Sequence, residues 1–240
     1  EFADARFELA LLLKDKGENE KSSAHLLKAI EIQPEFPQAH FHLALILKDM
    51  EDSKAAREHF SKAIDLDQDF ADAHYHYGLL LAGLEEYEEA KNNLEKATDI
   101  DQNYSLAYYH LAKLLIDPED YNKAKKNYLT AIDIDENFAE AHYYLGKLLS
   151  GGLQNDKDGT FMKKPEYDAA VIHYKKAISI NKDYAKAHYN LALVYKIQKH
   201  YNESRKHFEK AIKIVKDYAK AHFHLAMLLK ATGEVSSSKS

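Results

Sequence analysis

The chain has no cysteine, no tryptophan, only four prolines and only eight glycines in 240 residues. The absence of cysteine excludes disulfides, thiol chemistry and cysteine-based zinc sites, and it leaves the redox compartment open. No apolar run approaches the roughly 18 residues of a membrane-spanning helix, so no membrane partner is expected. No targeting segment is visible, and the localisation is left unassigned.

Motifs of known catalytic sites are also missing. The chain has no glycine-rich phosphate loop, no nucleophile elbow and no His-Glu-x-x-His zinc pattern. Fourteen histidines are present, but pairs such as His40 and His42 are spaced i, i+2, and such side chains diverge on a helix and cannot chelate one ion. We therefore predict that the protein is not an enzyme and uses no cofactor or metal.

The chain does contain an internal repeat of 34 residues. The segment 71–104 reappears after a shift of 34 residues, at 105–138 and at 37–70. Apolar or small residues fall at repeat positions 3, 4, 7, 8 and 11 and again at 20, 24, 27 and 28, which is helical spacing. A period of this length indicates a stacked array of helical hairpins rather than a globule with one centre.

Several repeat positions keep one kind of residue. Position 8 is always small, position 20 is serine or alanine, position 27 is alanine, and position 34 is aromatic in each full repeat. Small residues at fixed points let two helix backbones approach closely. The pattern resembles the tetratricopeptide repeat family, although position 4 is usually histidine rather than tryptophan and only Pro34 supplies the family's proline. The position-4 histidines are expected to be core or half-buried residues with hydrogen-bond partners.

The resemblance implies an all-α, right-handed α-solenoid of six full repeats plus a final helix. We predict a single array over residues 1–240. The repeats are expected at 3–36, 37–70, 71–104, 105–138, 139–184 and 185–218, followed by a terminal helix at 219–231 and a disordered tail at 233–240. The chain begins directly against a repeat helix and its last helix has a thin polar cap, which is typical of a piece of a longer protein.

The fifth repeat is 46 residues long and carries an inserted loop at 151–164. Asp156 and Asp158 match part of a calcium-binding loop, but Pro165 stands where the last ligand is needed, so a flexible polar excursion is the preferred interpretation. Phe161 and Met162 are expected to fold back on the scaffold, and contact with a partner is the alternative.

The net charge of −6 is unevenly distributed. Residues 1–138 carry 15 Lys+Arg and 29 Asp+Glu, a net charge of −14, whereas residues 139–240 carry 18 and 10, a net charge of +8. Drift among solvated surfaces is the preferred interpretation. The alternative is that the two ends attract opposite partners, or each other head to tail in a homo-oligomer. Nucleic acid is not expected as a partner, because the acidic half would repel phosphate.

In the resembled family the first helices of successive repeats line a concave face, which implies that positions 2, 5, 6, 9 and 12 point into it. Here position 5 is aromatic in all seven first helices, and position 6 is mostly histidine. Such a wall suits a peptide or helical segment of a partner. The predicted partner-binding residues are His42, Tyr75, His76, Tyr109, His110, Lys113, Tyr144, Lys147, Lys186, Asn190 and His224.

Packing between repeats is the preferred interpretation for position 5. The lysines at positions 2 and 9 of the later repeats are candidates to accept an acidic segment. No three repeats supply the family's carboxylate-clamp residues, so that kind of site is not expected. The leading hypothesis is a non-catalytic protein–protein interaction scaffold with a peptide or helix in its concave groove. The alternatives are a self-assembling structural module and a substrate-presenting arm of a larger enzyme. A pH response near 6, from the inner histidines, is a further hypothesis.

Overall fold

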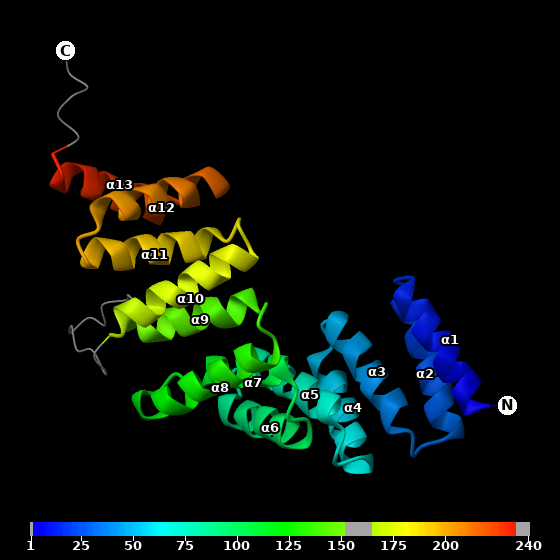
Figure 1. The fold of residues 1–240 in the computed structure, drawn as a ribbon. Helices are drawn as coiled ribbons and strands as arrows, with labels where there is room; N and C mark the ends of the chain where they lie inside the picture. Colours follow the sequence, from blue (N-terminus) through cyan, green and yellow to red (C-terminus); the bar gives the residue numbers. More distant parts are fainter. Residues whose placement is uncertain (1, 152–164, 234–240) are drawn as a thin grey trace. The chain divides into compact units, whose positions relative to one another are not determined.

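The computed structural model describes residues 2–151 and 165–233. Over these ranges the chain forms thirteen α-helices and one short 3₁₀ turn, and no strand (Figure 1). This confirms the all-α prediction. The inserted loop, with Asp156, Asp158, Phe161 and Met162, lies outside the described residues apart from Gly151, and so does the tail after Gly233.

The helices fall into two compact units, Glu1–Leu114 and Leu115–Ser240, and each is described by itself. The N-terminal unit contains α1 (Ala3–Asp15), α2 (Asn19–Ile32), α3 (Pro37–Asp49), α4 (Ser53–Leu66), α5 (Ala71–Gly83), α6 (Tyr87–Ile100) and α7 (Ser105–Leu114). Helices α1 and α2, α3 and α4, and α5 and α6 pack as hairpins, and each hairpin packs on the next. The N-terminal unit is therefore a stack of helical hairpins.

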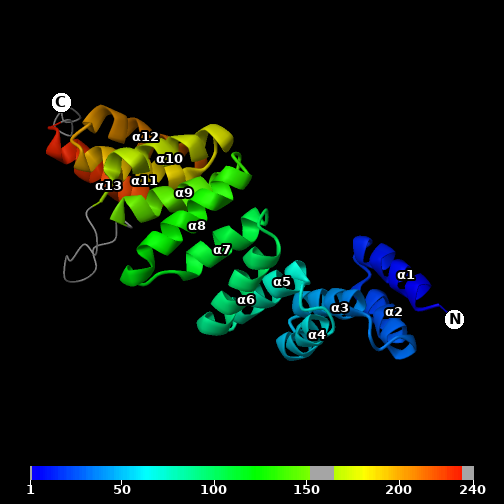
Figure 2. The same cartoon turned by 60° about the horizontal axis from the view of Figure 1, so that its bottom comes forward.

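The C-terminal unit follows the same plan. It contains η1 (Pro118–Asp120), α8 (Tyr121–Ile134), α9 (Ala139–Leu149), α10 (Tyr167–Ile180), α11 (Ala185–Ile197), α12 (Tyr201–Ile214) and α13 (Ala219–Ala231). Each helix from α8 to α13 packs against its neighbour in the chain, and Figure 1 shows α9 to α13 in that order; Figure 2 shows the same helices from a second side. The backbone N–H of Glu166 donates to the carbonyl of Leu149 at 2.8 Å, which holds α9 and α10 together where the long loop joins them.

The turn inside a hairpin needs one residue in the left-handed backbone region. Gly17 occupies it in the first repeat with φ +76°, whereas Glu51, Glu85 and Lys199 occupy it in three others with φ of 62–64°. Glycine adopts this conformation without the steric cost that a side chain adds. The first helix therefore stops at a fixed length in each of these repeats, and the second begins in register with it.

Close approach of the two helices explains the small residue at repeat position 8. A Cβ added to Gly78 would lie 3.0 Å from Cγ of Leu94, and one added to Gly146 would lie 3.0 Å from two ring atoms of Tyr174. Leu94 and Tyr174 are fully buried. The core of each hairpin is therefore a large side chain at position 24 packed against a small residue at position 8, as expected of close-packed helices.

Rings at positions 5 and 34 join each hairpin to the next. Their centroids lie 4.8–5.1 Å apart in five repeats, in the pairs Phe7–Phe36, Phe41–Phe70, Tyr75–Tyr104, Tyr143–Tyr184 and Tyr189–Tyr218. Position 34 directly precedes the first helix of the following repeat. These pairs therefore tie the start of a repeat to the first helix of the repeat before it.

Candidate functional site

The first helices of the N-terminal unit carry a row of histidines, one in each of three consecutive repeats. His42, His76 and His110, here called the histidine row, occupy position 6 of α3, α5 and α7. Each imidazole packs against the position-5 ring beside it and against the position-5 ring of the preceding repeat. The centroid distances are 5.1 and 5.4 Å for His42, 4.9 and 5.6 Å for His76, and 4.9 and 5.8 Å for His110.

The aromatic partners lie below the surface, and the imidazoles lie at it. Tyr75 and Tyr109 are 5% and 6% exposed, whereas the three imidazoles are half-buried. Burial thus gives the two tyrosines a packing role beneath the row, and burial also raises the pKa of Tyr75 to about 12. Contact between these tyrosines and a partner stays a prediction.

Burial keeps the histidine row neutral. Desolvation lowers the pKa of each of the three imidazoles to about 4. A lysine adds to the effect at each ring: Lys14 at His42, Lys48 at His76 and Lys113 at His110. The carboxylate of Asp72 opposes it at the first two rings. All three rings are therefore uncharged at neutral pH.

The position of the single proton follows from burial. Nδ1 of His42 and Nδ1 of His76 are buried and have no hydrogen-bond partner among the described residues. A buried N–H without a partner costs more than a buried lone pair, so the proton belongs on Nε2. Nε2 of these two rings has no hydrogen-bond partner among the described residues, and it is not buried. Each ring therefore presents an N–H donor to the solvent.

Leucine and lysine flank the row at position 9. Leu45 and Leu79 are half-buried, and Lys113 holds its ammonium 5.3 Å from the ring centroid of Tyr109. The six predicted residues of the N-terminal unit are thus neighbours, with four of them in one strip that also holds Leu45 and Leu79, and with the two tyrosines beneath it. The six are His42, Tyr75, His76, Tyr109, His110 and Lys113.

The five predicted residues of the C-terminal unit lie on α9, α11 and α13, and three of them, Tyr144, Asn190 and His224, contact neighbouring side chains. The amide of Asn190 donates to the hydroxyl of Tyr143 at 3.1 Å, which links α11 to α9. Tyr144 stacks on Tyr128 with ring centroids 6.5 Å apart. Lys147 and His224 are half-buried, and Lys186 is exposed. Asn190 therefore has a structural bond to exchange before it could bind a peptide.

Four of the five position-4 histidines are buried and hydrogen-bonded, as expected, whereas His222 on α13 is exposed. His40, His74 and His188 place Nε2 at 3.2–3.3 Å from the carbonyl oxygens of Pro34, Gln68 and Lys182 in the preceding turn. A carbonyl only accepts, so Nε2 carries the proton and donates it. In the neutral forms of His40 and His188, Nδ1 is then left as an acceptor.

Sequence reasoning missed the partners of these rings. Nδ1 atoms of two histidines lie 2.9–3.0 Å apart in three hairpins, in the pairs His40–His59, His142–His173 and His188–His207. In the first and third pairs, the second ring must donate from Nδ1 because Nδ1 of the first is an acceptor. The available signal was histidine at both position 4 and position 23 of the same repeats, with Asn93 opposite His74 in another.

No group of three or more histidine, aspartate or glutamate side chains in the described ranges is arranged to hold a metal ion. None of the helices searched there is long and apolar enough to cross a membrane. The chemistry offered by the described surface is that of hydrogen-bond donors, apolar strips and charged side chains.

Comparison with protein families finds the same repeat along most of the chain. A model described as "TPR repeat" matches residues 10–51, 114–150 and 160–199. A model described as "Tetratricopeptide repeat" matches residues 185–218, and a second model of the same description matches residues 37–70 and 71–104. No curated protein matches the sequence.

Solved structures with the same fold include three of different description. YrrB, described as a TPR protein with an unusual peptide-binding site, is 25% identical with a TM-score of 0.68, over 83% of this chain and 96% of its own. Pseudomonas aeruginosa pilF is 21% identical with a TM-score of 0.77, over 94% and 97%. The APC/C hetero-tetramer Cut9-Hcn1 supplies a chain that is 16% identical with a TM-score of 0.69, over 95% and 43%.

Proposed function

Because the chain belongs to the tetratricopeptide repeat family, we propose that it binds an extended or helical segment of a partner protein along the strip that carries the histidine row. The repeats make it a protein–protein interaction scaffold in general, and the proposal assigns that role to the strip. The proposal rests on the N–H donors of the histidine row. Nδ1 of His42 and of His76 is buried, and Nε2 of each ring faces the solvent.

The chemistry of the strip suits a peptide. A neutral imidazole N–H donates to a backbone carbonyl or a side-chain carboxylate without the desolvation cost of a full charge. Leu45 and Leu79 beside the row offer apolar contact to alternate side chains. Similarity to YrrB, described as having a peptide-binding site, supports the proposal. The proposal gives this chain no catalytic step.

The test begins with a displayed library of random peptides of about 12 residues, selected on the immobilised protein. Affinities of the enriched peptides are then compared between the natural chain and His42→Phe/His76→Phe/His110→Phe. Phenylalanine keeps a ring for packing and removes the donor, and Tyr144 shows that this repeat position accepts a six-membered ring. The matched control is His59→Asn on α4, a helix that carries no residue of the histidine row. Asn93 holds the same repeat position on α6.

Each lost hydrogen bond contributes about 0.5–1.5 kcal/mol, so the triple variant should bind at least about tenfold more weakly while the control does not change. Circular dichroism and a thermal melt confirm that each variant is folded. Peptides that bind the natural chain and the triple variant equally would remove the histidine row from the binding site.

Self-association is a second candidate, favoured by the last helix. Phe223 and Met227 of α13 are 61% and 47% exposed, whereas Tyr189, at the position of Phe223 one repeat earlier, is 9% exposed. Light scattering behind size exclusion would show a mass above 27.5 kDa that rises with concentration. Phe223→Ser should lower that mass, and a constant monomer mass for the natural chain would exclude this candidate.

A further inference from the structure

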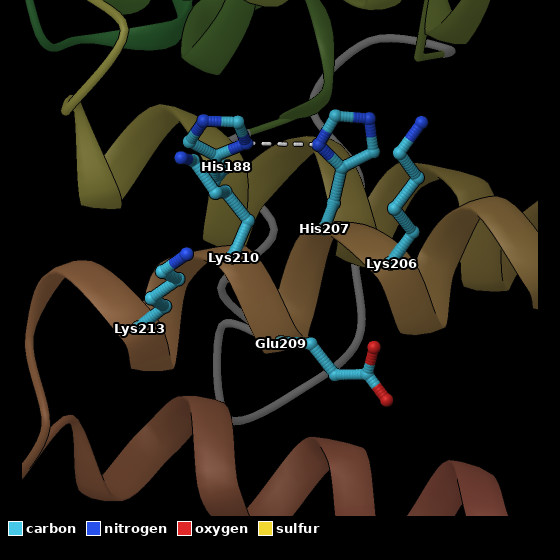
Figure 3. Close-up of a pocket in the computed structure, with 6 residues that line it drawn as sticks. All are labelled: His188, Lys206, His207, Glu209, Lys210 and Lys213. Atoms are coloured by element: carbon cyan, nitrogen blue, oxygen red, sulfur yellow. Dashed lines mark hydrogen bonds between the residues drawn. The ribbon is translucent and has the colours of Figure 1, made fainter.

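One side of α12 carries three lysines in a stripe. Lys206, Lys210 and Lys213 are spaced i, i+4 and i+7, which places them along one side of a helix. Figure 3 shows all three on the side of α12 where His207 meets His188, with the carboxylate of Glu209 directed away. Together these residues line an open hollow of about 440 Å³. The three lysines are here called the lysine stripe.

The lysine stripe has no anionic partner among the described residues. No carboxylate of that part of the chain forms an ion pair with any of the three lysines. Glu209, which lines the same hollow, accepts instead from Nε of Arg205 at 2.8 Å. Lys206 and Lys213 are exposed, and Lys210 is half-buried. Three like charges on two helical turns repel one another, so an anion that lies between them is attracted by all three.

The floor of the hollow is formed by two histidines whose pKa values are lowered by burial, and hydrogen bonds hold both rings. His188 and His207 join α11 to α12 through Nδ1 atoms 2.9 Å apart, and the carbonyl of Lys182 accepts from Nε2 of His188. Tyr195 stacks on His207 with ring centroids 5.8 Å apart. The charge of the surface therefore comes from the lysines, and the paired rings hold the helix that carries them in place.

Two other hairpins have the same pair of histidines and provide an internal comparison. The three stripe positions hold Glu58, Lys62 and Asp65 on α4, beside His40 and His59, and they hold Ile172, Lys176 and Ser179 on α10, beside His142 and His173. The net charge of the three stripe positions is thus −1 on α4, +1 on α10 and +3 on α12. The histidine pair is common to all three hairpins, so it does not require the lysines.

We propose that the lysine stripe of α12 is a second interaction surface, which binds an acidic segment of a partner protein. The stripe spans about 10 Å along the helix axis, at about 1.5 Å for each of its seven steps, which is the length of a few residues rather than of one small anion. Flexible lysine ammonium groups meet separate carboxylates as point charges. A long nucleic acid is disfavoured because the chain carries a net charge of −6.

Fluorescence anisotropy of a labelled hexaglutamate peptide tests this proposal, with hexaglutamine as the neutral probe. The natural chain should bind hexaglutamate at a salt concentration of about 20 mM, bind it more weakly at about 200 mM, and not bind hexaglutamine. Lys206→Glu/Lys213→Asp gives α12 the residues that α4 has at these positions, and it should lower the affinity for hexaglutamate at least about tenfold.

The reciprocal exchange is the positive control. Glu58→Lys/Asp65→Lys gives α4 three lysines beside His40 and His59, and in the background of the first variant it should restore binding of hexaglutamate. The exchanged residues are exposed and come from sibling repeats, so both variants should melt within a few degrees of the natural chain.

Three results would each overturn the proposal. They are equal binding of hexaglutamate by the natural chain and the first variant, no gain from the α4 exchange, and binding of inorganic tripolyphosphate without binding of hexaglutamate. Because the histidine-row variants leave α12 unchanged, they should bind hexaglutamate normally. Failure of the proposed binding along the histidine row and failure of the proposed binding at the lysine stripe are therefore distinguishable.

Discussion

Acidification should unfold this protein through its buried imidazoles. His42, His76 and His110 in the N-terminal unit, and His173 and His207 in the C-terminal unit, each have a pKa lowered by burial from 6.5 to about 4. Above pH 6.5 each ring is neutral in both the folded and the unfolded chain. Below it the unfolded chain takes up a proton that the folded ring refuses, so the free energy of unfolding falls between about pH 6.5 and about pH 4.

The size of the effect follows from the shift. A pKa difference of 2.5 between the unfolded and the folded ring corresponds to about 3.4 kcal/mol for each histidine once pH is below both values. At pH 5 the same difference amounts to about 2 kcal/mol for each ring. The three rings of the N-terminal unit together set an upper limit of about 6 kcal/mol there, a large part of the 5–15 kcal/mol typical of a whole domain.

Urea unfolding followed by far-ultraviolet circular dichroism at about pH 7.5, 6 and 5 measures this loss. His76→Asn removes one titrating ring with a residue that Asn190 shows to be acceptable at the same repeat position. The loss between pH 7.5 and 5 should be smaller in this variant by about 2 kcal/mol. Parallel pH profiles for the natural chain and the variant would show that His76 is not desolvated, and the inference of a neutral N–H donor would fail with it.

Substitutions at three further positions test the packing. Gly17→Ala should cost about 1 kcal/mol in urea unfolding, because φ is +76° and no atom lies near the added Cβ, so strain is the only cost. Tyr174→Phe should cost about 1 kcal/mol, because it removes the hydroxyl that lies 3.1 Å from Oγ of Ser150, and a larger loss would indicate repacking. His207→Leu should cost about 1–3 kcal/mol, since it leaves Nδ1 of buried His188 without a partner, whereas His207→Asn should cost less than half of that.

The repeating part of the fold could be predicted because the same kinds of residue recur at the same positions in successive repeats. The first helices of the repeats begin at Ala3, Pro37, Ala71, Ser105, Ala139, Ala185 and Ala219, where the 34-residue period and the inserted loop place them. A single small residue such as Gly78 predicts little by itself. A small residue, alanine or glycine, at position 8 of every repeat predicts a helix contact, which the close approach of Gly78 to Leu94 confirms.

The candidate site could be predicted only in part, because periodicity gives the direction of a side chain but not its depth. Positions 5 and 6 are neighbours on the first helix, and the resemblance implies that both point to the inner face, with packing between repeats preferred for position 5. In the structure Tyr75 is 5% exposed and His76 is half-buried, because the ring of Tyr75 is covered by Tyr104 and by His110 of the next repeat. That cover comes from residues about 30 positions away, so it is invisible until repeats are stacked.

The lysine stripe was missed for the opposite reason, since it breaks the repeat rather than follows it. Position 29 is acidic at Glu31, Asp65, Asp99 and Asp133, then becomes Ser179 and Lys213. Positions that pack are held constant by their neighbours in every hairpin, so they report the fold. Positions on the outer surface have no such constraint, and a change there alters the charge without altering the helix. In a chain of this kind, the residues in which one repeat differs from its siblings are therefore the ones to test for partner recognition.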